Sequence, residues 1–239
     1  MPWDGFVKHL IVNADDFGAS RGINRAILEL HELGVLTSTS LMMTMPAAHD
    51  AVKLAKTNPA LGVGLHVTLT DEDAVASVDF DDAASCMVAI QSQVDAFSAQ
   101  FDALPTHLDT HQNVHRDPRL TTIFKDVARR YGLPLREHSA VRYFSNFYGQ
   151  WEGDFHPEQI SVETLLQMLE TELREDSITE LSCHPGYVEA GFASPYNNER
   201  ELERRTLSDP RLREFFRANA VKLISFRDVP AVMARALGA

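Results

Sequence analysis

The sequence predicts an α/β protein in which helices cover a parallel sheet. Across 239 residues, short apolar runs rich in β-branched residues alternate with amphipathic helical runs, giving about seven β-α units. The connections between these runs are short, which is typical of parallel β-α-β folds. Right-handed crossovers then leave a doubly wound sheet or a (β/α) barrel. Since no linker rich in Pro, Gly or Ser divides the chain, residues 1–239 are expected to form a single domain.

The first third of the chain shows the alternation clearly. Residues 9–13 have the sequence HLIVN, an apolar run that predicts a strand buried on both faces. Residues 23–33 carry apolar side chains at positions 23, 27, 30 and 33, on one face of a predicted helix. Gly34 then stands where a glycine commonly ends a helix. The same patterns predict a strand at 37–44, a helix at 47–55 and a strand at 62–69.

The remaining elements follow an acidic loop expected at 71–82. A helix is predicted at 87–101, and residues 107–111 alternate like a short strand. Asp117-Pro118 combines a capping side chain with a proline at the first helical position, so a helix is expected over 118–131. A strand is predicted at 133–136, and residues 139–160 are irregular and aromatic. Further on, the pattern predicts helices at 162–173, 199–205, 211–218 and 231–237 and strands at 180–183 and 222–226.

The charge of the chain is negative and unevenly spread. Lys and Arg number 22 against 34 Asp and Glu, a net charge of −12. Residues 57–115 contain nine acidic residues and neither Lys nor Arg, so this stretch carries −9 of that charge. The balance argues against nucleic acid and an anionic membrane surface as partners, because both bind basic surfaces.

Other features argue against a membrane or extracellular protein. No run of about 18 apolar residues is present, so no membrane span is expected. The N-terminal MPWD lacks the basic and apolar regions of a signal peptide. Two cysteines, Cys86 and Cys183, do not make a disulfide framework. A cytoplasmic location is the resulting prediction.

Acids and imidazoles recur at the ends of successive strands, where parallel α/β folds place their active sites. Asp15 and Asp16 follow the first predicted strand, His66 lies near the end of the third, and His184 follows the strand at 180–183. Two adjacent carboxylates after a buried strand are costly unless a positive charge compensates them. A metal ion would let one aspartate ligate while the other acts as a base. The alternative is a pair of solvated acids at the start of a helix.

His107, His111 and His115 are spaced by four residues, with Asp109 among them. On a helix the histidines would share one face, but flanking prolines and the alternation favour a strand. His107, Asp109 and His111 would then point the same way, which suits a carboxylate that orients a metal-ligating imidazole. His115 would lie in the following loop, at the mouth of the site. The alternative is a set of hydrogen-bonded polar residues at a barrel end.

Three further features leave alternatives open. His184 is either a general acid or a hydrogen-bonded core histidine. Arg136 would hold a substrate oxygen or pair with an acid. An aromatic group suits either a sugar-stacking wall or a contact between two copies of the chain in a homodimer; its members are Tyr143, Phe144, Phe147, Tyr148 and Trp151.

Five stretches together resemble the YdjC-type carbohydrate deacetylases, also called the ChbG/HpnK family. They occur in the family's order across most of the chain: VNADDFGASRGIN at 12–24, GVLTSTSLM at 34–42, VGLHVTLT at 63–70, PTHLDTHQNVH at 105–115 and SCHPGYV at 182–188. The resemblance implies a distorted (β/α) barrel related to NodB-type polysaccharide deacetylases. It also implies one divalent metal ion, Mg²⁺ or Zn²⁺, whose ligands are Asp16, His66 and His111.

The same resemblance implies a reaction, the removal of N-acetyl groups from amino sugars such as chitooligosaccharides. Asp15 would act as base toward a metal-activated water, and His184, as imidazolium, would protonate the leaving amine. Residues expected to bind substrate or to orient the ligands are His107, Asp109, Asn113, His115 and Arg136.

The chain departs from the family pattern in three places. Asn113 stands where a histidine is usual, Ala89 where a glutamate is common, and the segment after His66 is shorter than in many members. These departures motivate an alternative, a metal- and sugar-binding protein without turnover. A third possibility is an amide or ester hydrolase that acts on a non-sugar substrate.

The stretch without Lys or Arg, residues 57–115, contains two of the three implied ligands. A fixed cation nearby would compete with a metal ion, so this gap is expected to favour a cation site. The acidic loop at 71–82 within it is expected to be a solvated rim.

Overall fold

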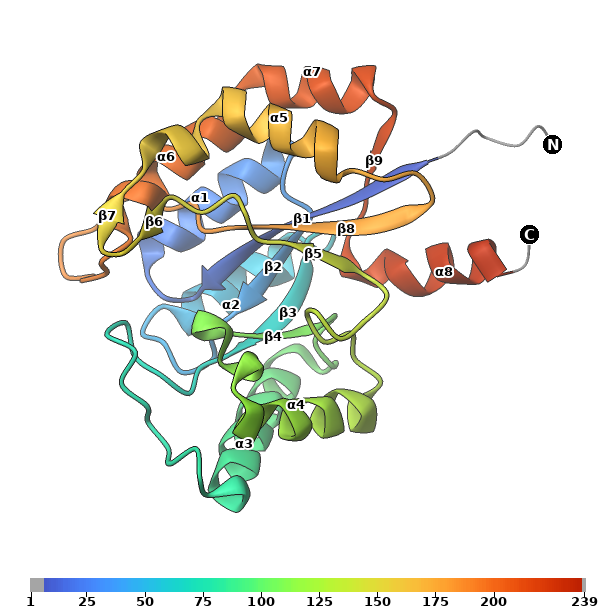
Figure 1. Cartoon of the computed structure of the whole chain (residues 1–239). Coiled ribbons are helices and arrows are strands. Elements are labelled where there is room, and N and C mark those ends of the chain that lie inside the picture. The colour runs from blue at the N-terminus through green and yellow to red at the C-terminus, as the bar shows by residue number, and fades with distance from the viewer. Residues whose placement is uncertain (1–6, 238–239) are drawn as a thin grey trace.

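The computed structural model describes residues 7–237, and its central feature is a seven-stranded sheet (Figure 1). The strand order is β4-β3-β2-β1-β8-β5, with β9 joined to β1, and every ladder between these described strands is parallel. The sheet curls into an open, distorted barrel, which confirms the predicted fold class. Its strands are β1 (Lys8–Phe17), β2 (Ser38–Leu41), β3 (Gly62–Val67), β4 (Leu108–Thr110), β5 (Arg142–Phe144), β8 (Ser177–Cys183) and β9 (Val221–Leu223).

Strand β1 lies at the centre of the sheet because its residues are suited to burial on both faces. Every residue from 10 to 17 is buried. On one side β1 pairs with β8; on the other it pairs with β9 along its amino half and with β2 along its carboxyl half. The strand extends past the predicted end at residue 13, so Asp15 and Asp16 belong to β1 itself.

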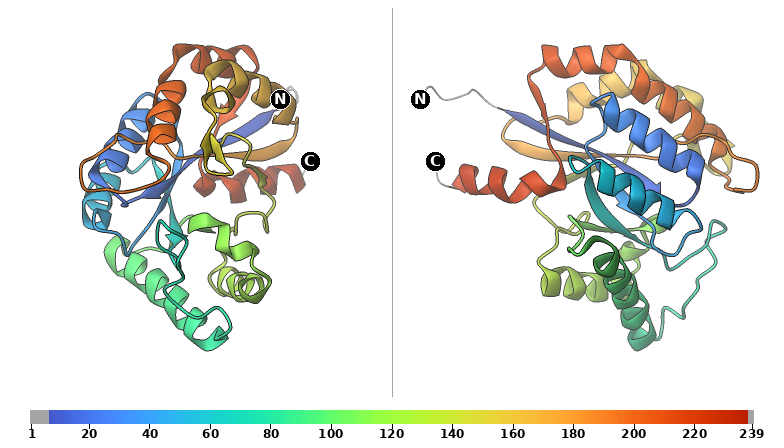
Figure 2. Two further views of the ribbon diagram at one scale, coloured as in Figure 1. Left: turned by 60° about the vertical axis from the view of Figure 1, so that its left-hand side comes forward. Right: turned by 180° about the vertical axis from the view of Figure 1, so that it is seen from behind.

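Helices cover this sheet on two sides. In Figure 1, α5, α6 and α7 lie above the sheet and α3 and α4 lie below it, while the rear view in Figure 2 shows α1 and α2 side by side. Each predicted helix is present, with ends that differ by a few residues. The bounds are α1 (Arg21–Glu32), α2 (Ala48–Thr57), α3 (Ala83–Phe101), α4 (Pro118–Tyr131), α5 (Val162–Glu172), α6 (Asn197–Ser208), α7 (Pro210–Ala218) and α8 (Val229–Leu237).

Local sequence explains where these helices begin and end. The Ser20 side chain accepts a hydrogen bond from the Ile23 N–H at the start of α1, and Gly34 follows the helix with φ +74°, as predicted. At the start of α4 the Asp117 carboxylate accepts from the Arg119 N–H, with Pro118 in the first turn. Both capping motifs were therefore sufficient to locate a helix end.

Two predictions about residues 133–160 are wrong. Residues 133–136 make one isolated bridge, Leu135 with Leu108, because the chain turns away at Glu137, where φ is +63°. The segment predicted as irregular instead supplies the edge strand β5 and a hairpin of β6 (Gln150–Trp151) and β7 (Asp154–Phe155). Since no ladder within residues 7–237 joins β4 to β5, the barrel stays open there.

The carboxyl ends of the strands set the position of the site. In Figure 1 the β1 arrow points toward the side that carries the β6–β7 hairpin and the loop between β3 and α3. Short 3₁₀ helices complete the connections: η1 (His111–Arg116), η2 (Pro157–Ile160) and η3 (Phe226–Asp228). Among the described helices, none combines the length and apolarity needed to cross a membrane.

Candidate active site

A cavity of about 440 Å³ opens at the carboxyl ends of the central strands. Its wall combines acids from β1 and from the loop after β3, imidazoles from β3, η1 and the end of β8, and aromatic rings from β5, from the segment after β5 and from the start of α6. The residues with titratable side chains on this wall are Asp15, Asp16, His66, Glu72, His111, Arg116, Tyr143, Tyr148, His184, Tyr196 and Arg200. The expected convergence of strand ends on one site is therefore observed.

A bulge in β1 turns both adjacent aspartates toward this cavity. In a regular strand Asp15 and Asp16 would point to opposite faces. The register between β1 and β2 instead shifts by one residue between Ala14 and Phe17, and Asp16 adopts φ +67°. Aspartate tolerates this left-handed conformation better than most residues. Both carboxylates consequently line one cavity from a single strand.

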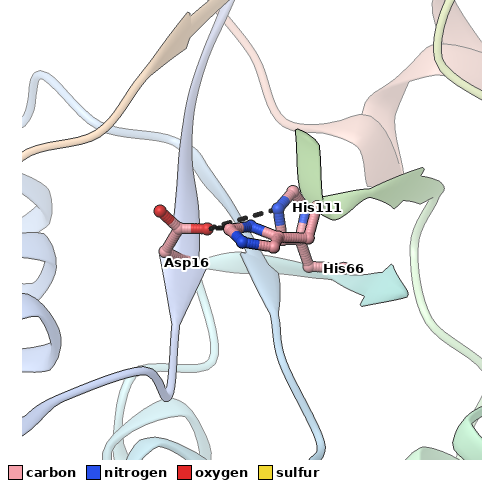
Figure 3. Close-up of side chains that lie close together, drawn as sticks. All are labelled: Asp16, His66 and His111. Atoms are coloured by element: carbon pink, nitrogen blue, oxygen red, sulfur yellow. Dashed lines mark ion pairs between the residues drawn. The ribbon is translucent and has the colours of Figure 1, made fainter. Parts of the chain in front are cut away.

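Asp16, His66 and His111 form one cluster of possible ligands in the site (Figure 3). Asp16 Oδ1 lies 3.3 Å from His66 Nε2 and 3.3 Å from His111 Nδ1. The three side chains come from β1, β3 and η1, and all are buried. Asp16 Oδ1 has no hydrogen-bond partner among the described residues. These donor atoms lie within 4.8 Å of one another and could hold a metal ion.

Asp109 fixes the orientation of His66. The carboxylate can only accept, so His66 Nδ1–H donates to Asp109 Oδ1 at 2.8 Å and leaves Nε2 facing Asp16. Burial alone would lower the pKa of this imidazole, but the charges of Asp109 and Asp15 outweigh burial and raise it to about 10. Without a metal ion, His66 is therefore protonated near neutral pH. Its proton supplies a positive charge at the place where a metal ion would otherwise bring one.

A second cluster, Asp15 with His66 and Asp109, also places three donor atoms close together. Its charge is already compensated by the buried Arg136 guanidinium. Arg136 Nη1 and Nη2 donate to the two oxygens of Asp15 at 2.7 and 2.8 Å, and Nη2 lies 2.7 Å from Asp109 Oδ2. Arg136 contacts both carboxylates of this cluster, whereas Asp16 Oδ1 has no hydrogen-bond partner in the described chain, so the cluster around Asp16 offers the freer ligand atom.

Arg136 thus pairs with acids, and it lies outside the residues that line the cavity. Besides Asp15 and Asp109 it binds Glu180 Oε1, at 2.6 Å from Nη2. Burial would raise the pKa of Asp15, but Arg136 overrides burial and holds it below its ordinary value. Asp15 is therefore ionised near neutral pH.

His184 stands at the cavity wall beside Asp15, with 3.7 Å between His184 Nε2 and Asp15 Oδ2. Burial lowers the pKa of His184 to about 4, and the charges of Asp15 and Asp16 only partly oppose that effect. The ring is uncharged near neutral pH. The imidazolium that the resemblance implies for the protonation of the leaving amine stays a prediction.

Glu203 of α6 lies behind His184 and was not found from the sequence. One of its oxygens accepts from the His184 backbone N–H, and the other accepts from the Tyr196 hydroxyl at 2.7 Å. The carboxyl is fully buried, and burial raises its pKa to about 8. Because α6 is a strongly polar helix, its sequence has no hydrophobic periodicity that would mark Glu203 as buried.

Arg200, also from α6, contradicts the expectation of a site without fixed cations. Its Nη2 donates to Asp16 Oδ2 at 2.6 Å, and the side chain is buried. Arg136 and Arg200 both lie outside residues 57–115 in sequence, yet the fold brings both to the site. The absence of Lys and Arg from residues 57–115 therefore did not predict an absence of cationic side chains from the site. Asp16 Oδ1 still faces away from Arg200, toward the two imidazoles.

His107 and His115 lie outside the cavity lining that the structure describes. His107 is buried, its Nε2 lies 2.9 Å from Ser40 Oγ, and it stacks on Phe226. Ser40 in turn donates to Asp109 at 2.6 Å, so His107 supports the orienting carboxylate. His115 was predicted at the cavity mouth, and this is wrong. It is fully buried between Thr110 and Glu137, because η1 folds it back under the chain.

Asn113 does line the cavity. Gln112 and Asn113 both adopt left-handed backbone conformations, φ +54° and +52°. This turn ends the strand pattern at Thr110 and places His111 at the start of η1. The strand predicted over residues 107–111 therefore ends one residue earlier, at Thr110.

The aromatic segment contributes to the wall of the same cavity. Tyr143, Phe147 and Tyr148 line it, and Tyr148 stacks on Tyr196 with ring centroids 4.7 Å apart. Trp151 lies on β6 with 43% of its surface exposed. Phe147 is buried and Arg136 lies over the Tyr143 ring, so Tyr148, 40% exposed, is the lining ring that offers a face of the kind on which sugars stack.

Comparison with known proteins decides the family. A sequence model described as YdjC-like protein matches residues 9–218. The chain belongs to the YdjC-like family. The carbohydrate deacetylase of Geobacillus stearothermophilus is 32% identical to this YdjC-like protein over 249 residues, covering 92% of this chain and 98% of that protein. Carbohydrate deacetylase 2 of Listeria innocua is 33% identical, with the same coverage. The resemblance predicted from five sequence stretches is confirmed.

Solved structures agree on the fold of this YdjC-like protein. A crystal structure from Enterococcus faecalis V583 superposes with a TM-score of 0.78 at 26% identity, covering 93% of this chain and 99% of that one. The catalytic domain of a peptidoglycan N-acetylglucosamine deacetylase from Eubacterium rectale superposes at 0.60 with 11% identity, covering 91% and 88%. The distorted barrel is therefore shared with deacetylases of distant sequence.

Proposed function

We propose that this YdjC-like protein removes N-acetyl groups from amino sugars, in chitooligosaccharides or related carbohydrates, with the help of one divalent metal ion. The observation that carries the proposal is the convergence of Asp16, His66 and His111 beside Asp15 and His184 in one cavity. Relatives that match nearly the whole chain are carbohydrate deacetylases, which supports the substrate class.

The donor set fits a divalent ion. Asp16 Oδ1 is buried without a hydrogen-bond partner in the described chain, and both imidazoles turn a ring nitrogen toward it. Two imidazoles and one carboxylate suit Zn²⁺ better than Mg²⁺, which prefers oxygen ligands. The chemistry that such an ion supplies when bound is polarisation of an amide carbonyl and acidification of water.

Asp15 takes the proton of the attacking water. Its two oxygens are held by Arg136, so the carboxylate is ionised and fixed in direction. As the proton moves to Asp15, the water oxygen forms a bond to the carbonyl carbon of the acetamide. The later breakage of the C–N bond releases acetate and requires a proton on the sugar nitrogen.

His184 delivers that proton. Because the ring is neutral at rest, the proton comes from water by way of Asp15, whose Oδ2 lies 3.7 Å from His184 Nε2. An imidazole with a pKa near 4 is a strong acid once protonated, so it passes the proton readily to the leaving nitrogen. Asp15 and His184 then regain their starting charges, and the atoms balance as amide plus water giving amine plus acetic acid, which ionises to acetate by giving its proton to water or to the amine.

The wall of the cavity positions the sugar. Tyr148 provides an exposed ring face, and Asn113 provides an amide that can donate or accept a hydrogen bond. Unlike a histidine, Asn113 cannot titrate near neutral pH, so its role is confined to binding.

Acetate release from N-acetylated chitooligosaccharides tests the proposal. The wild-type protein is expected to release acetate, to lose activity with a chelator and to regain it with Zn²⁺. His66→Ala and His111→Ala are each expected to abolish turnover. Full activity in both variants would contradict the proposal. The cytoplasmic location and the homodimer stay predictions from the sequence.

A further inference from the structure

The loop between β3 and α3 brings one carboxylate back to the active site. Its five aspartates are exposed, as expected for a solvated rim. Glu72 is the exception, because its side chain is only 18% exposed and lines the cavity. A tight turn presents it: Asp71 N–H donates to Val75 O at 3.0 Å, and Asp71 Oδ1 accepts from the Val75 N–H at 2.9 Å.

This turn is tied to the residue that follows His111. Gln112 Nε2 donates to the backbone oxygen of Asp71 at 3.0 Å and to that of Glu72 at 3.5 Å. Gln112 reaches the loop from a left-handed backbone conformation, φ +54°. The loop and η1 are therefore held together at the point where Glu72 and His111 meet.

Glu72 and His111 face each other through two atoms that lack partners. Glu72 Oε1 lies 3.7 Å from His111 Nε2, and both atoms are buried with no hydrogen bond in the described part of the chain. The other ring nitrogen, His111 Nδ1, faces Asp16. His66 has the same arrangement, with one nitrogen toward Asp16 and the other toward Asp109.

We propose that Glu72 positions His111 by accepting a hydrogen bond from its Nε2–H, which leaves the Nδ1 lone pair directed at a metal ion. The inference rests on the proposed metal site. A ligating imidazole carries its proton on the second nitrogen, and a carboxylate there fixes both the tautomer and the ring direction. Shortening 3.7 Å to a hydrogen bond of about 2.9 Å needs a shift of about 0.8 Å. The acidic loop thus contributes to the metal centre through a single residue.

Zinc affinity, measured by competition with a chromophoric chelator, tests this role. Glu72→Ala is expected to weaken Zn²⁺ binding about 10- to 100-fold. Glu72→Gln keeps an acceptor oxygen, so a smaller loss is expected. Asp73→Asn is the matched control, because it removes the same charge from an exposed neighbour; its affinity is expected to equal that of the wild type. The visible spectrum of bound Co²⁺ should shift in Glu72→Ala and not in Asp73→Asn.

The outcomes separate this inference from the proposed function. Wild-type affinity and an unchanged Co²⁺ spectrum in Glu72→Ala would overturn the role of Glu72 while leaving the metal site intact. A wild-type protein that binds neither Zn²⁺ nor Co²⁺ would overturn both. Unfolding midpoints measured without metal are expected to agree among the variants, since Glu72 Oε1 makes no hydrogen bond in the described chain.

Discussion

Arg136→Met removes the one guanidinium that three buried carboxylates share. Arg136 is 2% exposed, and Asp15, Asp109 and Glu180 are each 3% exposed or less. Its nitrogens donate to both oxygens of Asp15 and to Glu180, and one lies 2.7 Å from Asp109. Methionine fills much of the same volume without charge, so the variant isolates the electrostatic role.

The expected loss of stability follows from that geometry. Removing one partner of a buried ion pair costs about 3–5 kcal/mol, because the remaining charge is left uncompensated. For a chain of 239 residues, each kcal/mol lowers the unfolding midpoint by about 2 °C, so the midpoint is expected to fall by about 6–10 °C.

The pH dependence of the stability provides a second test of the role of Arg136. In the wild type, Arg136 holds the pKa values of Asp15 and Asp109 below normal, so their stabilising contribution is present at neutral pH and is lost as pH falls through those lowered values. Without Arg136, burial and mutual repulsion raise both pKa values. The deficit of the variant should therefore be largest near pH 7 and shrink toward pH 5.

The unfolding midpoints of the wild type and of Arg136→Met are measured by calorimetry at pH 5 and pH 7, with Arg142→Met as the control variant. Arg142 pairs with Glu172 in a partly exposed position, where an ion pair contributes about 1 kcal/mol or less. Equal midpoints for Arg136→Met and Arg142→Met, or a deficit that grows toward pH 5, would refute the reasoning.

Three further outcomes are expected. Gly64→Ala should lower the free energy of unfolding by about 1–3 kcal/mol in urea titrations, because a Cβ would lie 2.3 Å from the His107 ring; wild-type stability would contradict that contact. Glu203 keeps its proton in the folded state up to about pH 8 but loses it near 4.5 when unfolded, so wild-type stability should fall as pH rises from 5 to 8. The fall should be smaller in Glu203→Gln, and parallel profiles would argue against a raised pKa. His184→Gln should reduce acetate release about 10²- to 10⁴-fold while Zn²⁺ affinity stays unchanged, and a matching loss of affinity would assign His184 to the metal instead.

Local patterns predicted the fold because they act over a few residues. The Asp117-Pro118 cap located α4, and the spacing of Ile23, Ile27 and Leu30 located α1. The weak strand at 133–136 was misjudged, since its pairing depends on a turn at Glu137 rather than on its own sequence.

The candidate site was predictable only where motif residues lie close in sequence to a strand end. His66 and the Asp15–Asp16 pair met that condition, although the bulge that aligns both aspartates did not show in the alternation. Arg200 and Glu203 did not, because α6 brings them to the site from more than 180 residues beyond Asp16. Contacts between residues so far apart in the chain leave no periodic pattern in the sequence.

The central claim is that one divalent ion binds between Asp16, His66 and His111. Anomalous diffraction at the zinc edge, from crystals grown with Zn²⁺ and acetate, tests it most directly. The account predicts a single strong peak about 2.0–2.2 Å from Asp16 Oδ1, His66 Nε2 and His111 Nδ1, with acetate beside His184. A peak between Asp15 and Asp109, or no peak at this cluster, would contradict it.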